Sequence, residues 1–244
     1  MNYHNVAEQT WNYLTTASHW TGPDGLWALL VQQLLLSVTA LVIAAVIGLP
    51  IALWLGHVGR GSFLAINVSN IGRAVPTFAL LAILVTTETP GVKTFGPYGR
   101  AGISTLIALT AFALPPIITN ANVAIREVPG PVKESATGMG MTGWQLFSRV
   151  ELPLGMPLIV SGLRLALVQV WATATIAALV AGPGLGNLIT EGFYRSDYGM
   201  ALGAAVVVAV VAFLMELAGA VVERSVDPTR KAGADAREVT AVGT

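Results

Sequence analysis

The sequence predicts an all-α protein embedded in a membrane, on the basis of its composition, its hydropathy and the length of its apolar runs. Of its 244 residues, 54% are hydrophobic and only 11% are charged, and the mean hydropathy is +0.69. A soluble domain carries about 25% charged residues, so this chain suits a lipid environment. Its formal net charge is zero, and no basic cluster indicates binding to nucleic acid.

Five apolar intervals are long enough for a membrane-spanning helix, which needs roughly 20 residues. They are Leu26–Leu55, Phe63–Thr87, Ala101–Ala124, Leu154–Ala181 and Gly199–Val222. We therefore predict about five transmembrane helices in a membrane domain of residues 26–226.

The distribution of Lys and Arg predicts the orientation, because cytoplasmic loops are enriched in both. If the N-terminus lies outside, the cytoplasmic segments contain Arg60, Arg126, Lys133, Arg149, Arg224, Arg230, Lys231 and Arg237. The external segments then contain only Lys93, Arg100 and Arg195. We predict that the N-terminus lies outside and the C-terminus inside.

Both ends of the chain are predicted to lie outside the membrane domain. Residues 1–25 contain Trp11, Tyr13 and Trp20 among polar neighbours. They favour a short helix at the external interface, with a frayed tail as the alternative. Residues 227–244 mix charge, Gly and Ala, and are expected to be a disordered cytoplasmic tail.

Residues 129–153 form the most polar long interval between two predicted spans. Pro129 and Pro131 end the preceding helix, and a short helix is predicted from near Val132 through Phe147. The small residues of this segment permit close approach by another protein. The segment also contains more apolar residues than a solvated loop needs. Pro153 marks the entry to the next span.

A known pattern runs through this interval. Glu134-Ser135-Ala136, then Gly140, Val150 and Leu152-Pro153 keep the spacing E-A-A, three residues, G, nine residues, I, one residue, L-P. The chain therefore resembles the membrane (permease) subunits of binding-protein-dependent ABC importers. Ser135 replaces the usual Ala, and Val150 replaces the usual Ile.

The resemblance implies the type I ABC importer permease fold, with a cytoplasmic coupling helix between the third and fourth spans. It implies that this segment contacts a cytoplasmic ATPase through Glu134, Ser135, Ala136, Gly138, Gly140, Trp144, Leu146, Phe147, Leu152 and Pro153. The alternative is an ordinary loop between two helices.

Further stretches look like the glycine betaine, choline and carnitine branch of these permeases. They are Ala74–Leu84, Thr137–Met141 with Trp144, Val150–Arg164 and Ala172–Gly186. The resemblance implies a quaternary-amine osmoprotectant as cargo, delivered by an external binding protein. It also implies an ATPase dimer, a second permease subunit and a multi-pass location in the bacterial cytoplasmic membrane.

The sequence gives no indication of an enzyme or a bound cofactor. It has no G-x-x-x-x-G-K-[ST] phosphate loop, no cysteine, and no metal-ligand spacing among His4, His19 and His57. ATP hydrolysis is therefore assigned to a separate subunit.

Two alternative functions for the chain stay open. They are a permease for methionine or another amino acid, and a secondary carrier or channel that works without ATP.

Three ionisable residues, Arg73, Arg164 and Glu216, fall inside predicted spans. Because a charge in hydrocarbon is costly, we predict that Glu216 pairs with Arg164 or Arg73. For Arg73, snorkelling toward the inner headgroups is the alternative.

A path for a soft cation suits aromatic faces and neutral oxygens. The candidates are Phe78, Trp171, Thr173 and Thr175. Packing of Trp171 against a neighbouring helix is the alternative.

Overall fold

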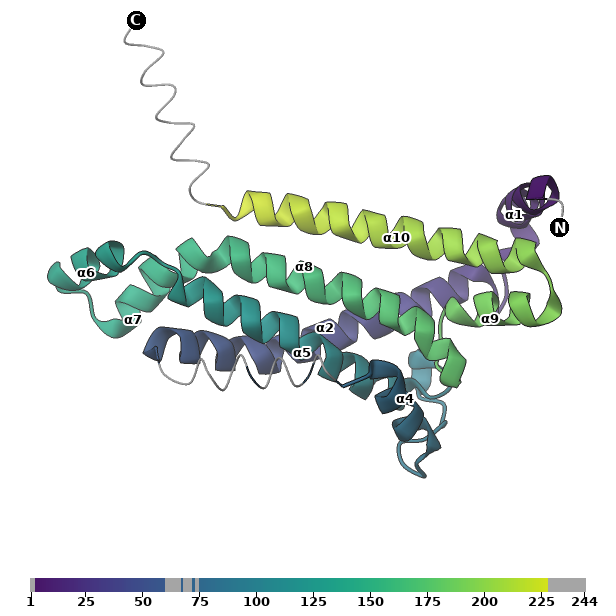
Figure 1. Ribbon diagram of the computed structural model, residues 1–244, viewed down its shortest axis with the longest axis horizontal. Helices are drawn as coiled ribbons and strands as arrows, with labels where there is room; N and C mark the ends of the chain where they lie inside the picture. Colours follow the sequence, from purple (N-terminus) through teal and green to yellow (C-terminus); the bar gives the residue numbers. More distant parts are fainter. Residues whose placement is uncertain (1–2, 60–66, 68–71, 73–74, 228–244) are drawn as a thin grey trace, which may run out of the picture.

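The computed structural model describes residues 3–59, 67, 72 and 75–227, and these residues form helices and connecting turns without a strand. Four long helices lie along the long axis of the molecule (Figure 1). They are α2 (Leu26–Val58), α5 (Gly102–Arg126), α8 (Leu152–Ala177) and α10 (Tyr198–Ser225). The predicted all-α class is confirmed.

Four helical segments in the described part of the chain are long and apolar enough to cross a membrane. They are Leu26–Val58, Gly102–Arg126, Gly143–Val180 and Tyr198–Ser225. Each overlaps one of the predicted intervals, and the third begins before the predicted Leu154. Much of the remaining interval, Phe63–Thr87, lies outside the described residues. Its described end forms the short apolar helix α4 (Thr77–Thr86).

Small side chains allow the long helices to pack closely. The central core is made by α2, α5 and α8 through Leu36, Ala40, Ala44, Leu109, Ala113, Ile117, Ala166, Val170 and Ala174. A Cβ at Gly56 of α2 would lie 3.0 Å from the carbonyl oxygen of Asn122, and one at Gly155 of α8 would lie 3.0 Å from that of Ala124. Glycine thus permits α5 to touch both neighbours, as is common between membrane helices.

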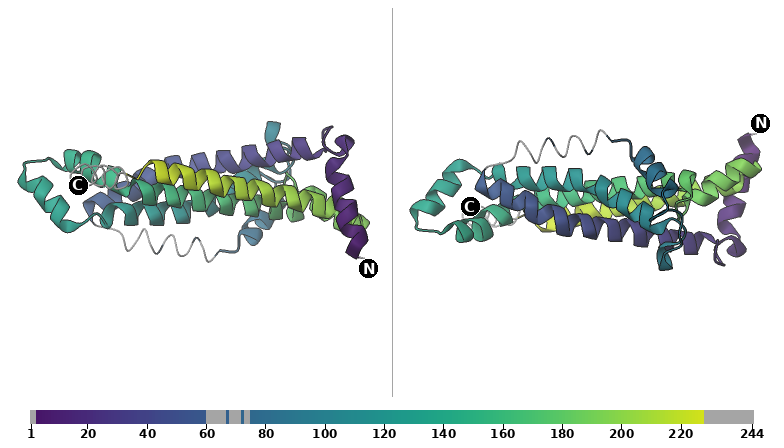
Figure 2. Two further views of the ribbon diagram at one scale, coloured as in Figure 1. Left: turned by 90° about the horizontal axis from the view of Figure 1, so that it is seen from above. Right: turned by 90° about the horizontal axis from the view of Figure 1, so that it is seen from below.

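The short helices gather at the two ends of the bundle. At one end, α1 (Tyr3–Thr15) lies across the start of α10, close to α9 (Gly186–Arg195) (Figures 1 and 2). At the other end lie α6 (Gly130–Gly138) and α7 (Gly143–Leu146). Three 3-10 turns and one π-helix complete the described elements: η1 (Ala17–His19), η2 (Gly96–Tyr98), η4 (Ala178–Val180) and the π-helix η3 (Phe147–Glu151).

The N-terminal segment is helical where the sequence predicted a short helix. Gly203 of α10 lets α1 approach, because a Cβ there would lie 2.6 Å from the ring of Tyr13. The position of this segment at a membrane surface remains a prediction. Asp227 is the last described residue, so the rest of the predicted C-terminal tail lies outside the described residues.

Candidate functional site

The predicted coupling segment protrudes from the end of the bundle that lies away from α1 (Figure 1). The prediction of one helix from near Val132 through Phe147 is wrong, because α6 and α7 are separate. Gly140 has a φ of +86° in the left-handed region, which glycine adopts without steric cost. Thr142 then begins α7 with a capping box, in which its side chain and that of Gln145 each accept a backbone N–H.

The segment is fused to the following span without a break. Gly143–Val180 is one helical run, and η3 forms its wide turn. There the N–H of Leu152 donates to the carbonyl of Phe147, five residues earlier. This π-turn lies directly before Pro153, which lacks the N–H of a regular helix. The segment α7 and the span α8 therefore belong to one continuous helical run.

The predicted docking residues differ in how far they face outward. Exposed members of the set are Glu134, Ser135, Gly138, Gly140, Trp144 and Pro153. Leu146, Phe147 and Leu152 are half-buried. Ala136 is buried by this chain itself, so its side chain does not face outward. Met139, directly after α6, is 74% exposed, so it also presents an apolar side chain outward.

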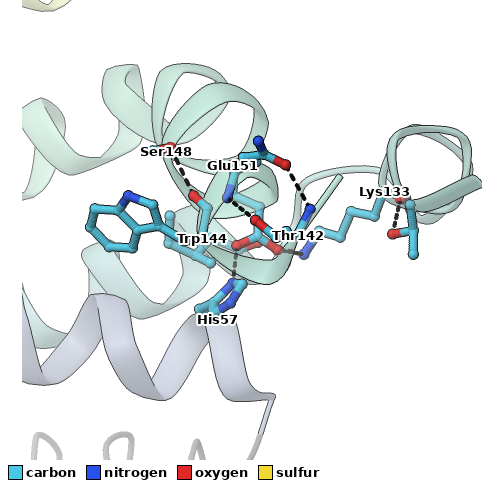
Figure 3. A network of polar contacts seen from close by, with 9 residues as sticks. His57, Lys133, Thr142, Trp144, Ser148 and Glu151 are labelled. Atoms are coloured by element: carbon cyan, nitrogen blue, oxygen red, sulfur yellow. Dashed lines mark hydrogen bonds and ion pairs between the residues drawn. The ribbon is translucent and has the colours of Figure 1, made fainter. Parts of the chain in front are cut away.

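A polar cluster around one buried carboxylate lies next to this segment, and its two other members are about a quarter exposed (Figure 3). Glu151 is 2% exposed, and its two carboxylate oxygens have different partners. Oε2 lies 2.5 Å from Nδ1 of His57, and Oε1 lies 3.2 Å from Nζ of Lys133. We call these three residues the Glu151 node.

The node joins four elements of the fold. His57 is near the end of α2, Lys133 is in α6, and Glu151 ends η3. The ammonium group of Lys133 also donates to the carbonyl of Ile125, 2.8 Å away. Ile125 is in the last turn of α5, where carbonyls lack helical partners. One lysine thus attaches α6 to both Glu151 and α5.

Aromatic rings of the segment rest against α2 beside the node. The ring of Phe147 meets that of His57 edge-on at 5.4 Å, and Trp144 lies 5.6 Å from Phe147. An apolar hollow of about 310 Å³ is lined there by Pro50, Leu53, Trp54, His57, Trp144 and Phe147.

Sequence reasoning gave no role to His57 or Glu151. The three histidines have neither metal-ligand spacing nor a place near Glu216 that would suit a catalytic base, and this left His57 without an expected partner. A carboxylate directly before Leu152-Pro153, at the start of an apolar span, was the available signal, because such a charge requires a partner. The partner itself was hidden, because His57 and Glu151 are 94 residues apart.

The structure brings two of the three intramembrane ionisable residues together. Nη1 of Arg164 lies 3.5 Å from Oε1 of Glu216, and Nη2 lies 3.2 Å from Oε2 of Glu223, which the prediction did not include. Gly219 makes room for the arginine stem, since a Cβ there would lie 2.6 Å from Cγ of Arg164. Arg73 lies outside the described residues.

The four candidate path residues have different surroundings. Phe78 is 46% exposed on α4, whereas Trp171 is fully buried and its indole N–H donates to the carbonyl of Val208 at 3.0 Å. The hydroxyl of Thr173 donates to the carbonyl of its own helix at Gln169. The hydroxyl of Thr175 donates to the carbonyl of Trp171 at 3.3 Å. Trp171 therefore packs between α8 and α10 in this conformation.

A second buried polar contact, also missed from the sequence, lies near the opposite end of α2. The amide of Gln33 is 0% exposed, donates to Oγ1 of Thr175 at 2.9 Å and accepts the N–H of Leu185 at 2.9 Å. Gly184 has a φ of +109°, and a Cβ there would lie 2.8 Å from Oε1 of Gln33. The glycine-rich turn after the fourth predicted span is thus attached to α2.

Comparisons with known proteins agree with this architecture. The family described as binding-protein-dependent transport system inner membrane component matches residues 44–228. The carnitine transport permease protein OpuCB of Listeria monocytogenes is 32% identical over 240 residues, which cover 97% of this chain and 94% of that protein. The glycine betaine/carnitine/choline transport system permease protein OpuCB of Bacillus subtilis (strain 168) is 30% identical over 199 residues, covering 81% and 86%.

A solved structure of the MetNI methionine ABC transporter in an inward-facing conformation shares the fold. Its matching chain gives a TM-score of 0.70 at 21% identity, over 82% of this chain and 95% of that chain. The fold, the motif-bearing segment and these relationships lead to one conclusion. This chain belongs to the family of inner membrane components of binding-protein-dependent transport systems, the permease subunits of ABC importers.

Proposed function

We propose that this chain forms the translocation pathway of an ATP-driven importer for a quaternary-amine osmoprotectant, such as carnitine, glycine betaine or choline. The relationship to the Listeria carnitine permease, which extends over 97% of this chain, carries the assignment of the cargo class. The Bacillus relative supports the same class of cargo. The likeness to the methionine transporter concerns the fold and does not favour methionine.

The working complex contains partners at both ends of the bundle. A cytoplasmic ATPase dimer docks on α6 and α7, where Glu134, Met139 and Trp144 are exposed. An external binding protein delivers cargo at the end that carries α1 and α9. A second permease subunit, identical or similar, completes the pathway. This arrangement assumes the orientation predicted from Lys and Arg, with the N-terminus outside.

Transport then proceeds by alternating access. ATP closes the ATPase dimer, and the α6–α7 segment passes this motion into the helices. Phe78 is the predicted path residue with the largest exposed face and is a candidate to contact the cationic cargo. Arg164 lies between Glu216 and Glu223, so none of these three charges is isolated in the bundle.

Uptake into proteoliposomes tests this function. The chain is reconstituted with the ATPase, the binding protein and any second permease produced by the same bacterium. Uptake of labelled carnitine, glycine betaine, choline and methionine is measured with and without enclosed ATP. We expect saturable uptake of at least one quaternary amine that requires both ATP and the binding protein.

Two results contradict the proposal. Uptake of methionine alone rejects the cargo class, and uptake without ATP rejects the importer mechanism.

A substitution tests the docking surface separately. Glu134→Arg is expected to weaken association with the ATPase, because the side chain of Glu134 is exposed on α6. Glu127→Arg, at an exposed position just before the segment, is the matched control.

A further inference from the structure

We infer that Glu151 is a positioning residue that makes α2, α5 and the α6–α7 segment move together when the ATPase displaces that segment. This inference rests on the proposed function. It adds a specific internal contact through which the motion passes, whereas the docking surface alone explains only where the motion enters.

The first step of the argument is that Glu151 cannot be treated as a surface ion pair. Its side chain is 2% exposed, and each carboxylate oxygen has its own cationic or N–H partner. Exposed ion pairs exchange readily with water, but a buried carboxylate that loses a partner has nothing to replace it. The node therefore resists separation of its three members.

The second step concerns the direction of the short hydrogen bond. An ionised carboxylate only accepts hydrogen bonds, so with Glu151 ionised beside the ammonium group of Lys133, the hydrogen is assigned to Nδ1 of His57. The edge-on contact with Phe147 holds the imidazole ring in the orientation that this bond needs. The contact from α2 to the segment is thus both polar and packed.

The third step is that the partners of Glu151 come from separate helices. His57 belongs to α2, and Lys133 belongs to α6 and also holds the last turn of α5 through the carbonyl of Ile125. Glu151 itself is the last residue of η3, directly before α8. A shift of α6 and α7 must either carry the ends of α2 and α5 with it or break contacts around a buried charge.

The rival explanation is that the node only stabilises the fold. A stabilising contact, once removed, lowers the amount of folded complex but leaves the cargo moved per ATP unchanged in the molecules that remain. A positioning residue, once removed, leaves ATP hydrolysis running while less cargo moves. The ratio of cargo imported to ATP hydrolysed separates the two explanations.

The test uses the full reconstituted complex and two variants of the node. Glu151→Leu removes the carboxylate, and His57→Phe keeps a ring against Phe147 while it removes the hydrogen bond. Glu127→Gln is the control, since this carboxylate is exposed and outside the node. We expect both node variants to lower the cargo imported per ATP by about fivefold, and the control to match the wild type.

A distance measurement checks the mechanical claim independently. The chain has no cysteine, so Val58→Cys and Val132→Cys can carry a pair of spin labels at exposed positions on α2 and α6. Pulsed electron paramagnetic resonance is recorded without nucleotide and in an ATP-trapped state. We expect one narrow distance in both states for the wild type, and an ATP-dependent change in the two node variants.

The outcomes distinguish the inference from the proposed function. If both node variants keep the wild-type ratio of cargo to ATP and the constant distance, the inference is overturned. If Glu151→Leu fails to assemble, His57→Phe decides by the same two measurements. If the unmodified complex imports no quaternary amine with ATP, the proposed function fails, and the label distance still shows whether α2 and α6 move together.

Discussion

Gln33 and Leu185 are joined by a hydrogen bond of 2.9 Å, from the backbone N–H of Leu185 to the side-chain oxygen of Gln33, although 152 residues separate them. The same buried amide donates to Oγ1 of Thr175 at 2.9 Å. Both ends of the glutamine amide are therefore satisfied in a region closed to water, as buried polar groups require. This contact holds the turn before α9 onto α2.

The first prediction concerns removal of this amide. We expect Gln33→Leu to lower the free energy of unfolding by about 2 kcal/mol, because the N–H of Leu185 loses its acceptor in a buried site. The apparent melting temperature of the purified chain in detergent measures the effect. Gln9→Leu, at an exposed glutamine of α1, serves as the control and should leave the melting temperature unchanged.

The second prediction concerns the buried Trp171. We expect Trp171→Phe to lower the free energy of unfolding by about 1–2 kcal/mol. The variant loses the hydrogen bond from the indole N–H to the carbonyl of Val208, and its smaller ring leaves a cavity in the core. The KM for cargo should stay unchanged. A changed KM with normal stability would mean that Trp171 contacts the cargo. Trp27→Phe, at a position that is 62% exposed, is the control.

The third prediction concerns the arginine between two carboxylates. Arg164→Met leaves Glu216 and Glu223 without their shared cation. We expect the free energy of unfolding to fall by about 1–2 kcal/mol, and the fall is limited because both carboxylates are partly exposed to solvent. Glu216→Gln retains the contact between Arg164 and Glu223, so its effect should stay below about 1 kcal/mol. Thermal unfolding of the purified variants gives both values.

Charge reversal gives a sharper check of the same pair. Arg164→Glu and Glu216→Arg should each reduce the yield of folded protein, and the double variant should recover part of that loss. The recovery should be incomplete, because Glu223 then faces a carboxylate at position 164. Equal yields for the double variant and the worse single variant would contradict a direct pairing.

The fourth prediction concerns pH. Tyr13 stacks on His19 with ring centroids 4.2 Å apart. Burial, with the carboxylates of Asp197 and Glu191, raises the pKa of Tyr13 above its ordinary value near 10. The neutral phenol is thus favoured in the folded state. The neutral phenol of Tyr13 contributes fully to stability below about pH 10, the ordinary pKa that it has in the unfolded chain. This contribution is lost as the pH rises through the raised pKa of Tyr13 in the folded protein.

Tyr13→Phe removes this titration. Between about pH 9 and 12, the melting temperature of the wild type should fall more steeply than that of the variant. Tyr194→Phe, at a tyrosine that is 91% exposed, should follow the wild type. Parallel curves for the wild type and Tyr13→Phe would contradict the proposed shift.

Much of the fold could be predicted because long apolar intervals leave few structural alternatives in a membrane. Prolines also located the start of α6, which begins at Gly130 beside Pro129 and Pro131. The break between α6 and α7 was missed, although two local signals were present. Gly140 is suited to a left-handed turn, and Thr142-Gly-Trp-Gln145 has the spacing of a capping box.

The polar contacts could not be predicted in the same way. Helical periodicity relates residues three or four positions apart, whereas His57 and Glu151 meet only because α2 and η3 end at the same place. The high cost of an unpaired charge in hydrocarbon predicted that Glu216 pairs with Arg164 or Arg73. The additional contact with Glu223 could not be predicted, because it depends on Gly219 and on the packing of α10 against α8.

The placement of the two buried contacts along α2 has a consequence for how deep the protein sits in its membrane. Gln33 and His57 are 24 positions apart (57 − 33), a rise of about 36 Å along a helix. The hydrocarbon layer is about 30 Å thick, and apolar Leu36, Ala40 and Ala44 fill the interval between them. With these apolar residues centred in the hydrocarbon, the two polar attachments would lie near opposite headgroup layers, at a spacing comparable to the thickness of the lipid.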